Sequence, residues 1–449
     1  MTATSQIKTR SLVRPRAAAK LVLFGVLGLN LVFVWLMFFT SDVPQKNTLI
    51  TIGRFLGLHV ALVMIFQLVL IARLPWLDRR LGMDQLTTIH RWVGFTLFWT
   101  LLAHVAFIVT GFAQLDGNPV PVQIISLAGS FPVLLGMIAF LIVGLVAVVS
   151  ARYARRRLSY EAWHAIHFLL YLVIVLALIH QMFEITTFTV SSLSRAYWWL
   201  LWTLAIAALL IGRIVMPLVR NARHQFRVAA VVPEADDVVS VHVTGRHLDK
   251  LPALAGQFML WRFPGHNAWW QVNPWSLSAA PNGVSLRLTA KAIGRTSAGL
   301  RDLPVGARVF AEGPYGALTS LARTKPSSVL IAGGIGVTPI RALLEELTGP
   351  MTVLYRVPTM GHAVLIAELR ALAGMRDAEL HVLTGRTGEG SPPNTPFAPQ
   401  NLERLVPDIR DRDIYICGPE ALTVAVLKAL GELGVARTQI HAERFRLAG

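Results

Sequence analysis

The 449-residue sequence contains a single cysteine, Cys417. One cysteine excludes disulfide bonds within the chain and any iron–sulfur cluster held by several cysteines. The segment 114–130 contains no lysine or arginine, although the whole chain has a formal net charge of +17. A basic chain can bind nucleic acid, but the second half shows no basic face, which argues against that class.

Long apolar runs are abundant instead. Hydrophobic residues make up 54% of the chain and are concentrated before about Arg220, which predicts a membrane half followed by a globular half. No small-residue cleavage site follows the first run, so we interpret it as a retained span rather than a signal peptide. Six runs are long enough to cross a bilayer: 19–40, 50–73, 87–113, 131–150, 161–182 and 196–218.

Lysine and arginine flank these spans unevenly. They cluster before the first span and after the second, fourth and sixth, whereas the loop after the third has none. By the positive-inside rule, both termini lie in the cytoplasm. We therefore expect a multi-pass protein of a bacterial inner or plasma membrane, in contact with anionic lipid and with its globular half in the cytoplasm.

Four histidines inside the spans form two similarly spaced pairs. His90 and His104 are fourteen residues apart in the third span, and His167 and His180 are thirteen apart in the fifth. Fourteen residues cover roughly 21 Å of a helix, which is most of a bilayer core. Spans three and five run in the same direction, so His90 meets His167 at the cytoplasmic level and His104 meets His180 at the outer level. Each pair could clamp a haem, and the alternative is that all four bond to backbone carbonyls.

The fifth span has an angular problem. At about 100° per residue, thirteen steps leave His180 roughly 140° from His167, so this helix needs a kink, a bulge or different rotamers. Two other histidines, His59 and His164, lack a second histidine at this spacing, and we do not expect them to bind iron.

The globular half changes pattern partway along. From Phe226 to about Gly316, short strands alternate with turns, which predicts an antiparallel β-barrel. From Ser328 onward, strands alternate with helices, which predicts a parallel sheet with crossover helices. The expected fold is therefore multi-domain: an all-α six-helix transmembrane bundle over 1–220, the barrel over 221–322 and an α/β domain over 323–449.

A glycine loop lies between the first strand and the first helix of this last domain, in the sequence AGGIGVTP. Its glycines allow the backbone to approach a ligand closely, and the N–H groups of the helix start can bind phosphate. The loop lacks the G-x-G-x-x-G spacing, so alone it is also compatible with a plain tight turn. The residues concerned are Gly333, Gly334 and Gly336, with Thr338 expected as helix cap and Pro339 as first helical residue.

Several segments of the globular half resemble the ferredoxin–NADP reductase superfamily. The segment 256–281 resembles its flavin-binding stretch, 288–300 and 311–316 resemble its next two signatures, and GGIGVTP and CGP (417–419) resemble its nicotinamide-binding ones. Fused behind six spans with paired histidines, this module resembles the ferric reductase and NADPH oxidase family. The resemblance implies FAD, two haem b groups and NADPH or NADH as cofactors.

The resemblance also assigns the flavin site. It implies that Pro274, Trp275 and Ser276 hold the isoalloxazine, with the Ser276 hydroxyl toward the reactive flavin nitrogen. The family usually has arginine or histidine where Asn273 stands, so Lys291 becomes the candidate for neutralising the flavin phosphate. The pyrophosphate would be held by Gly294, Thr296 and Ser297.

The nicotinamide side is assigned in the same way. Phe445 resembles the aromatic residue that covers the flavin, although ordinary core packing is an equal alternative. Cys417, with Gly418 and Pro419, resembles the segment near the nicotinamide, and we expect the thiol to make a contact without acting as a nucleophile. Arg356 and Arg386 each follow a predicted strand, where they could pair with a 2′-phosphate or simply be solvated.

The predicted function is electron transfer from cytoplasmic NAD(P)H through FAD and two haems to an acceptor outside. Histidine on both sides of each iron leaves no open position, so the acceptor would be reduced without binding iron. Oxygen is the favoured acceptor, ferric chelates come next, and quinone stays open.

Arg54 could pair with haem propionates or attract an anionic acceptor, or it could lie at the interface. A non-catalytic haem-bearing membrane anchor and a metal or proton transporter are the alternatives of another class, although the spans lack the broken helices of transporters.

Overall fold

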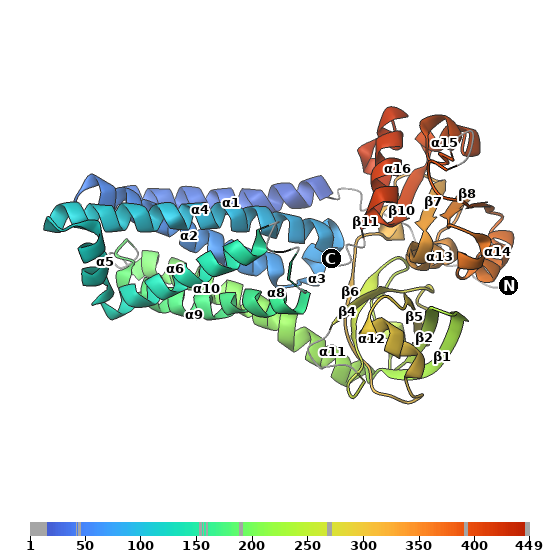
Figure 1. Ribbon diagram of the computed structural model, residues 1–449, viewed down its shortest axis with the longest axis horizontal. Helices are drawn as coiled ribbons and strands as arrows, with labels where there is room; N and C mark the ends of the chain where they lie inside the picture. Colours follow the sequence, from blue (N-terminus) through green and yellow to red (C-terminus); the bar gives the residue numbers. More distant parts are fainter. Residues whose placement is uncertain are drawn as a thin grey trace. The chain divides into compact units, whose positions relative to one another are not determined.

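The computed structural model describes residues 16–41, 43, 46–151, 155, 157–158, 160–187, 192–266, 272–389 and 394–444. The chain folds into two compact units (Figure 1). We call residues 20–73 and 85–211 the helical unit, and residues 74–84 and 212–444 the sheet unit. The expected domain limits at 220 and 322 stay predictions.

The helical unit contains the spans. Among the described residues, six helices are long and apolar enough to cross a membrane, and the expected number and order of spans are confirmed. Figure 1 shows the helices running alongside one another, with α6 packed along α9 and α10 along α2. Their bounds are α1 Arg16–Phe39, α2 Thr48–Ile71, α4 Met83–Asp116, α5 Val120–Ala128, α6 Phe131–Ser150, α8 Tyr160–His167, α9 Leu169–Glu184 and α10 Ser192–Leu210.

The bundle has a small aromatic core and an apolar outer surface. Trp198 and Trp202 of α10 are buried against Leu58 and Leu62 of α2. The Trp202 indole donates a hydrogen bond to the side chain of Gln181 in α9, at 3.1 Å. Large apolar side chains are exposed along most of the spans, which would be unfavourable in water and suits a lipid solvent.

Two details differ from a plain set of straight spans. The fifth span is interrupted at Phe168, between α8 and α9, where the Tyr171 amide bonds back to the Phe168 carbonyl. The break falls between His167 and His180, although the Phe168 backbone itself stays helical. The segment expected as a loop after the third span also contains a helix, α5, whose buried Gln123 bonds to Asp116 and Asn118.

The first lobe of the sheet unit consists of two three-stranded antiparallel sheets. One has the order β1-β2-β5 and the other β4-β3-β6, and both contribute to one core that includes Val241, Trp261 and Leu288. The strands are β1 Arg227–Ala235, β2 Val238–Thr244, β3 Phe258–Arg262, β4 Asn273–Ser276, β5 Ser285–Lys291 and β6 Phe310–Tyr315.

These sheets do not close into the expected barrel. Among the described residues, only single bridges, Leu277 to Leu288 and Arg227 to Arg308, join them outside the named strands. Closure needs continuous pairing around the ring. The four-residue β4 is too short to supply it, and β1 has a bulge after Pro233, which lacks an amide hydrogen.

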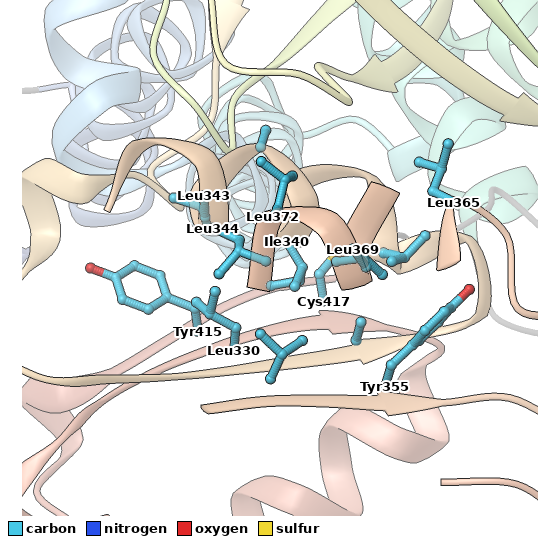
Figure 2. Packing of buried hydrophobic residues seen from close by; sticks show 14 of the residues in the cluster. Leu330, Ile340, Leu343, Leu344, Tyr355, Leu365, Leu369, Leu372, Tyr415 and Cys417 are labelled. Atoms are coloured by element: carbon cyan, nitrogen blue, oxygen red, sulfur yellow. The ribbon is translucent and has the colours of Figure 1, made fainter. Parts of the chain in front are cut away.

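The second lobe is a five-stranded parallel sheet in the order β11-β10-β7-β8-β9, which confirms the predicted alternation of strands and helices. Figure 2 shows one face, where Ile340, Leu343 and Leu369 pack over Leu330 and Tyr415. The strands are β7 Ser328–Gly333, β8 Met351–Arg356, β9 Glu379–Leu383, β10 Asp413–Gly418 and β11 Ile440–Arg444, and the helices are α13 Val337–Glu346, α14 Ile366–Met375, α15 Pro399–Leu405 and α16 Glu420–Glu432.

Shorter helices complete the sheet unit. Helices α3 (Pro75–Leu81) and α11 (Met216–His224) both pack on β6. The buried Asp78 accepts a hydrogen bond from the Gly316 amide at 2.9 Å, and the Asn221 amide group exchanges two hydrogen bonds with the Ala311 backbone. The rest are α12 Arg295–Ala298, the π-helix η1 Ile211–Val215, and the 3-10 turns η2 Leu248–Lys250, η3 Gly299–Asp302, η4 Ser320–Ala322, η5 Gly334–Gly336, η6 Met360–His362, η7 Ile409–Asp411 and η8 Arg437–Gln439.

Carboxylates of the second lobe hold the two lobes together. Glu368 of α14 forms a bidentate pair with Arg287 of β5, at 2.8 and 3.0 Å. Glu345 and Glu346, at the end of α13, accept hydrogen bonds from the backbone amides of Ala280 and Ala255. Because Arg287 is largely buried, this pair is shielded from screening by salt. The lobes therefore present a fixed cleft.

A buried carboxylate also anchors the chain where it enters the second lobe. Asp413 bonds to the His441 ring at 3.0 Å and to the Thr324 and Lys325 amides at 2.6 and 2.5 Å. Burial by itself would raise the pKa of Asp413, but these hydrogen bonds outweigh it and hold the pKa below its ordinary value. The ionised form is therefore the folded form.

We expect Asp413→Asn to destabilise the sheet unit by about 1–3 kcal/mol, because a charged acceptor of several buried donors is lost. The measurement is thermal unfolding of the wild type and the variant in detergent. A depressed pKa stabilises the fold above the unfolded value near 3.9, so the difference between the two proteins should shrink as the pH falls below about 4. Asp411→Asn is the control, since Asp411 is exposed. Equal melting of the Asp413→Asn variant and the wild type would contradict this account.

Candidate functional site

A cavity of about 760 Å³ opens between the two lobes of the sheet unit. It lies at the carboxyl ends of the parallel strands, where the strand order reverses between β7 and β10 and where ligands bind in such sheets. The predicted residues that line it are Lys291, Gly333, Gly334, Arg356, Arg386 and Pro419.

The cavity wall and the predicted set of residues differ in both directions. Sequence reasoning missed Asp237, His362 and Phe397, which line the cavity. Phe397 precedes α15 and His362 lies in a short turn, so neither followed a strand end or a motif that could have marked it. Phe445 lies outside the described residues. The predicted residues away from the cavity wall are Pro274, Trp275, Ser276, Gly294, Thr296, Ser297, Gly336, Thr338, Pro339, Cys417 and Gly418.

The glycine loop is shaped by close backbone packing. Gly334 has a φ of +52°, which favours glycine. A Cβ on Gly333 would lie 2.9 Å from the Pro419 ring, and one on Gly336 would clash with the Cys417 carbonyl. The glycines therefore bring the loop against the end of β10, which leaves its backbone exposed toward the cavity.

Two expectations about the following helix were wrong. Thr338 does not cap α13, because its hydroxyl donates to the Ile335 carbonyl at 3.0 Å and the cap position falls on Gly336. Pro339 is the third residue of α13 rather than the first. It still lies in the first turn, where the missing amide hydrogen removes no helical hydrogen bond.

Cys417 is fully buried at the end of β10. Burial, and then the charge of Glu443, raises the pKa of its thiol well above the ordinary value. The thiol therefore stays protonated at neutral pH, which gives no basis for nucleophilic chemistry. Its contact with the nicotinamide stays a prediction, because Cys417 does not line the cavity.

The predicted flavin strand carries unpaired buried polar atoms. In β4, the Asn273 amide nitrogen and the Ser276 hydroxyl are buried without a hydrogen-bond partner. Arg356 is similar, because one of its nitrogens bonds the Thr384 carbonyl at 2.7 Å while the other is buried and unpaired. Buried polar groups are rarely left unpaired, so such atoms fit a ligand that would bond to them.

Two parts of the expected flavin site are already engaged. Lys291 forms an ion pair with Asp237 at 3.1 Å, so its charge is partly compensated without a phosphate. The Ser297 hydroxyl accepts hydrogen bonds from the Ile293 and Gly294 amides, at 2.9 and 3.0 Å. The roles assigned to Lys291, Gly294, Thr296 and Ser297 stay predictions.

In the helical unit, His90 and His167 face each other. Their ring centroids are 6.2 Å apart and the ring planes make an angle of 68°. A metal ion binds imidazole nitrogen at about 2 Å, so two opposite ligands place their ring centroids roughly 6 Å apart. The spacing fits one iron between the two rings.

His104 and His180 are held from behind. The Nδ1 atom of His104 bonds the Gly53 carbonyl at 2.7 Å, and that of His180 bonds the Pro132 carbonyl at 3.0 Å. Metal-binding histidines commonly use one ring nitrogen in this way, which fixes the other toward the metal. The carbonyl bonds of the alternative interpretation therefore exist, but they leave Nε2 available on both rings.

Two glycines make room for these rings. A Cβ on Gly57 would lie 2.8 Å from the His104 ring, and one on Gly136 would lie 2.9 Å from the His180 ring. Both contacts are too close for a real side chain. The positions of the two histidines therefore depend on having no side chain at these points.

The other polar residues of the spans have different partners. His59 has both ring nitrogens bonded, one to the Trp35 indole at 2.7 Å and one to the Phe55 carbonyl at 2.8 Å. It has no nitrogen left for iron, in line with the expectation. Arg54 donates to the Thr186 hydroxyl at 2.8 Å, so it joins α2 to the segment after α9.

Comparison with known proteins finds one family match among the membrane spans and another in the second lobe of the sheet unit. Residues 56–178 match the family described as a ferric reductase like transmembrane component, and residues 330–428 match the oxidoreductase NAD-binding domain. The first match contains His90, His104 and His167 and ends two residues before His180. The second contains the glycine loop, Arg356 and Cys417.

Individual relatives match about half of the chain. The chain is 25% identical over 241 residues to the glycine betaine monooxygenase reductase subunit of Chromohalobacter salexigens, covering 50% of this chain and 65% of that protein. It is 30% identical over 241 residues to the flavohemoprotein of Chromobacterium violaceum, covering 49% and 60%. The chain thus spans less than two thirds of either relative. The solved flavohem-like FAD/NAD-binding domain of a Vibrio cholerae nitric oxide dioxygenase is 25% identical, with a TM-score of 0.41, covering 49% and 98%.

We expect Gly136→Ala to displace His180 and to lower the haem content from two per chain to about one. The added methyl group cannot fit beside the ring, whereas alanine itself favours a helix. Haem per protein is measured from the pyridine haemochrome of purified material. Gly144→Ala on the same helix is the matched control, since nothing lies within 4 Å of its Cβ. Full haem content in the Gly136→Ala variant would show that His180 is not an iron ligand.

Proposed function

We propose that this chain, which joins a ferric reductase-like transmembrane component to a ferredoxin reductase-like module as the ferric reductase and NADPH oxidase family does, carries electrons from NAD(P)H across a membrane. The observation that carries the proposal is the 6.2 Å spacing of the His90 and His167 rings inside a membrane bundle. The route runs from NAD(P)H to FAD, then to two haems and an outer acceptor. The soluble lobes are cytoplasmic.

The cavity between the lobes is the site for NAD(P)H in this proposal. Its glycine loop offers backbone amides, and Pro419 lies on the wall beside the end of β10. Arg356 supplies a guanidinium with an unpaired nitrogen to a 2′-phosphate, and Arg386 is exposed at the same wall. Together these residues favour NADPH over NADH.

The flavin lies along β4 in this proposal. The Ser276 hydroxyl is buried without a hydrogen-bond partner and is free to bond a flavin nitrogen, whereas the Trp275 ring packs beside Phe263. Asn273 offers an amide in place of the usual cation. The flavin supplies the change from a two-electron hydride donor to the one-electron carriers that follow.

The paired histidines complete the route. His90 with His167 and His104 with His180 each hold one haem b, and Arg54 is near the outer pair because it follows Gly53, the carbonyl partner of His104. Two histidines on each iron exclude direct binding of the acceptor. The acceptor is then reduced at the protein surface, with oxygen giving superoxide, or a ferric chelate as the second candidate.

A comparison of acceptors tests this function. Purified protein with NADPH is assayed for superoxide in air and for ferric-chelate reduction without oxygen. His104→Leu and His180→Leu should abolish reduction of either acceptor and remove one haem, while NADPH still bleaches the flavin. Wild-type protein without a Soret band would favour a transporter, and haem without NADPH-dependent flavin bleaching would favour a non-catalytic anchor.

A second prediction concerns the nucleotide. We expect Arg356→Ala to raise the KM for NADPH about 10- to 100-fold, because one or two charge-assisted hydrogen bonds to the 2′-phosphate are lost. The KM for NADH, which lacks this phosphate, should change much less. The readout is flavin reduction by each nucleotide in rapid mixing. Arg370→Ala, on the exposed face of α14, is the control. Equal changes for both nucleotides would place Arg356 away from the 2′-phosphate.

A further inference from the structure

One of the four paired histidines lacks the support that two others have. His104 and His180 each bond a backbone carbonyl through Nδ1, whereas the Nδ1 atom of His167 is buried without a hydrogen-bond partner. A hydrogen bond at this atom normally fixes the orientation of a metal-binding imidazole. Something else must therefore hold the plane of the His167 ring.

The neighbour that does so is Trp163, one helical turn earlier in α8. Its ring stacks on the His167 ring, with centroids 4.9 Å apart and planes inclined by only 29°. Residues four apart lie on the same face of a helix, so the stack is built into the local geometry. The adjacent His164 is turned mainly to Phe168, at 4.3 Å.

Trp163 is itself fixed from two directions. Its indole nitrogen donates to the Ser150 hydroxyl at the end of α6, at 3.1 Å. The Arg155 guanidinium lies over its ring at 5.0 Å, within the range of a cation–π interaction. A tryptophan held at its edge and its face cannot rotate easily, so it passes this rigidity to the imidazole stacked on it.

We propose that Trp163 is the positioning residue of the inner haem site and sets the plane of the His167 imidazole. The inference rests on the proposed function, since it requires a haem between His90 and His167. Trp163 replaces the carbonyl bond used at the outer level. It also defines the 68° angle between the two rings, and this angle between axial imidazoles governs the magnetic anisotropy of a low-spin ferric haem.

The test compares low-temperature electron paramagnetic resonance spectra of the oxidised full-length protein. We expect Trp163→Leu to shift the largest g-value of one haem and leave the other unchanged, because only His167 loses its support. The affinity of that site for haem should fall about 10- to 100-fold, as with other supporting residues of metal ligands. The midpoint potential of the same haem should also shift.

Two further variants decide the meaning of the result. Trp163→Phe keeps an aromatic stack but loses the hydrogen bond to Ser150, so it should retain haem and shift the g-value less than Trp163→Leu does. Trp199→Leu removes a partly exposed tryptophan of α10 and should change neither. Unchanged spectra in Trp163→Leu overturn the inference, and so does an equal loss of haem in Trp163→Leu and Trp163→Phe, because the retained aromatic ring would then make no difference. Absence of low-spin haem signals in the wild type would instead overturn the proposed function itself.

Discussion

An imidazole in an apolar helix bundle must satisfy its ring nitrogens, and this constraint organises the helical unit. A buried polar group without a partner costs about 1–3 kcal/mol, so each nitrogen needs a carbonyl, another side chain or a metal. His59 meets the requirement within the protein at both nitrogens. His104 and His180 meet it at Nδ1, whereas the Nδ1 atom of His167 is buried without a partner and its ring is supported by stacking on Trp163. The number of ring nitrogens bonded within the protein therefore separates a structural histidine from candidate iron ligands more clearly than position in the sequence does.

In the sheet unit, some buried polar atoms have no hydrogen-bond partner within the protein. Its unpaired buried atoms are those of Asn273, Ser276 and Arg356 among others, and all three lie where the resemblance assigns a cofactor. Other buried polar groups are satisfied, as Asp413 is by a histidine ring and two backbone amides. Ser328 and Tyr415, which do not line the cavity, also have a buried hydroxyl without a partner. The unpaired atoms at the expected contact points fit a ligand that would bond to them.

Much of this arrangement could be predicted from the sequence, because hydropathy and spacing are strong local signals. The six spans and the parallel sheet follow from hydropathy and periodicity, and the pairing of His90 with His167 follows from the direction of the spans. The spacing of His167 and His180 left a kink, a bulge and different rotamers open. Features set by tertiary contact did not. Barrel closure depends on pairing at strand ends, and the Thr338 hydroxyl chose the Ile335 carbonyl over a capping role. Phe397 reaches the cavity from a loop that carries no pattern.

Under the proposed function, nucleotide discrimination resides in the cleft between the lobes. Arg287 and Glu368 form a bidentate pair across the lobes, and Arg341 adds a second arginine to the same carboxylate at 2.8 Å. The charges of the two arginines and their hydrogen bonds outweigh the effect of burial and lower the pKa of Glu368, so the network stays ionised throughout the neutral range. The network links the two lobes beside the cavity, so side chains already on the wall can meet a ligand there. Among them Arg356 has both a positive charge and an unpaired nitrogen, which is why the proposed function assigns it the 2′-phosphate.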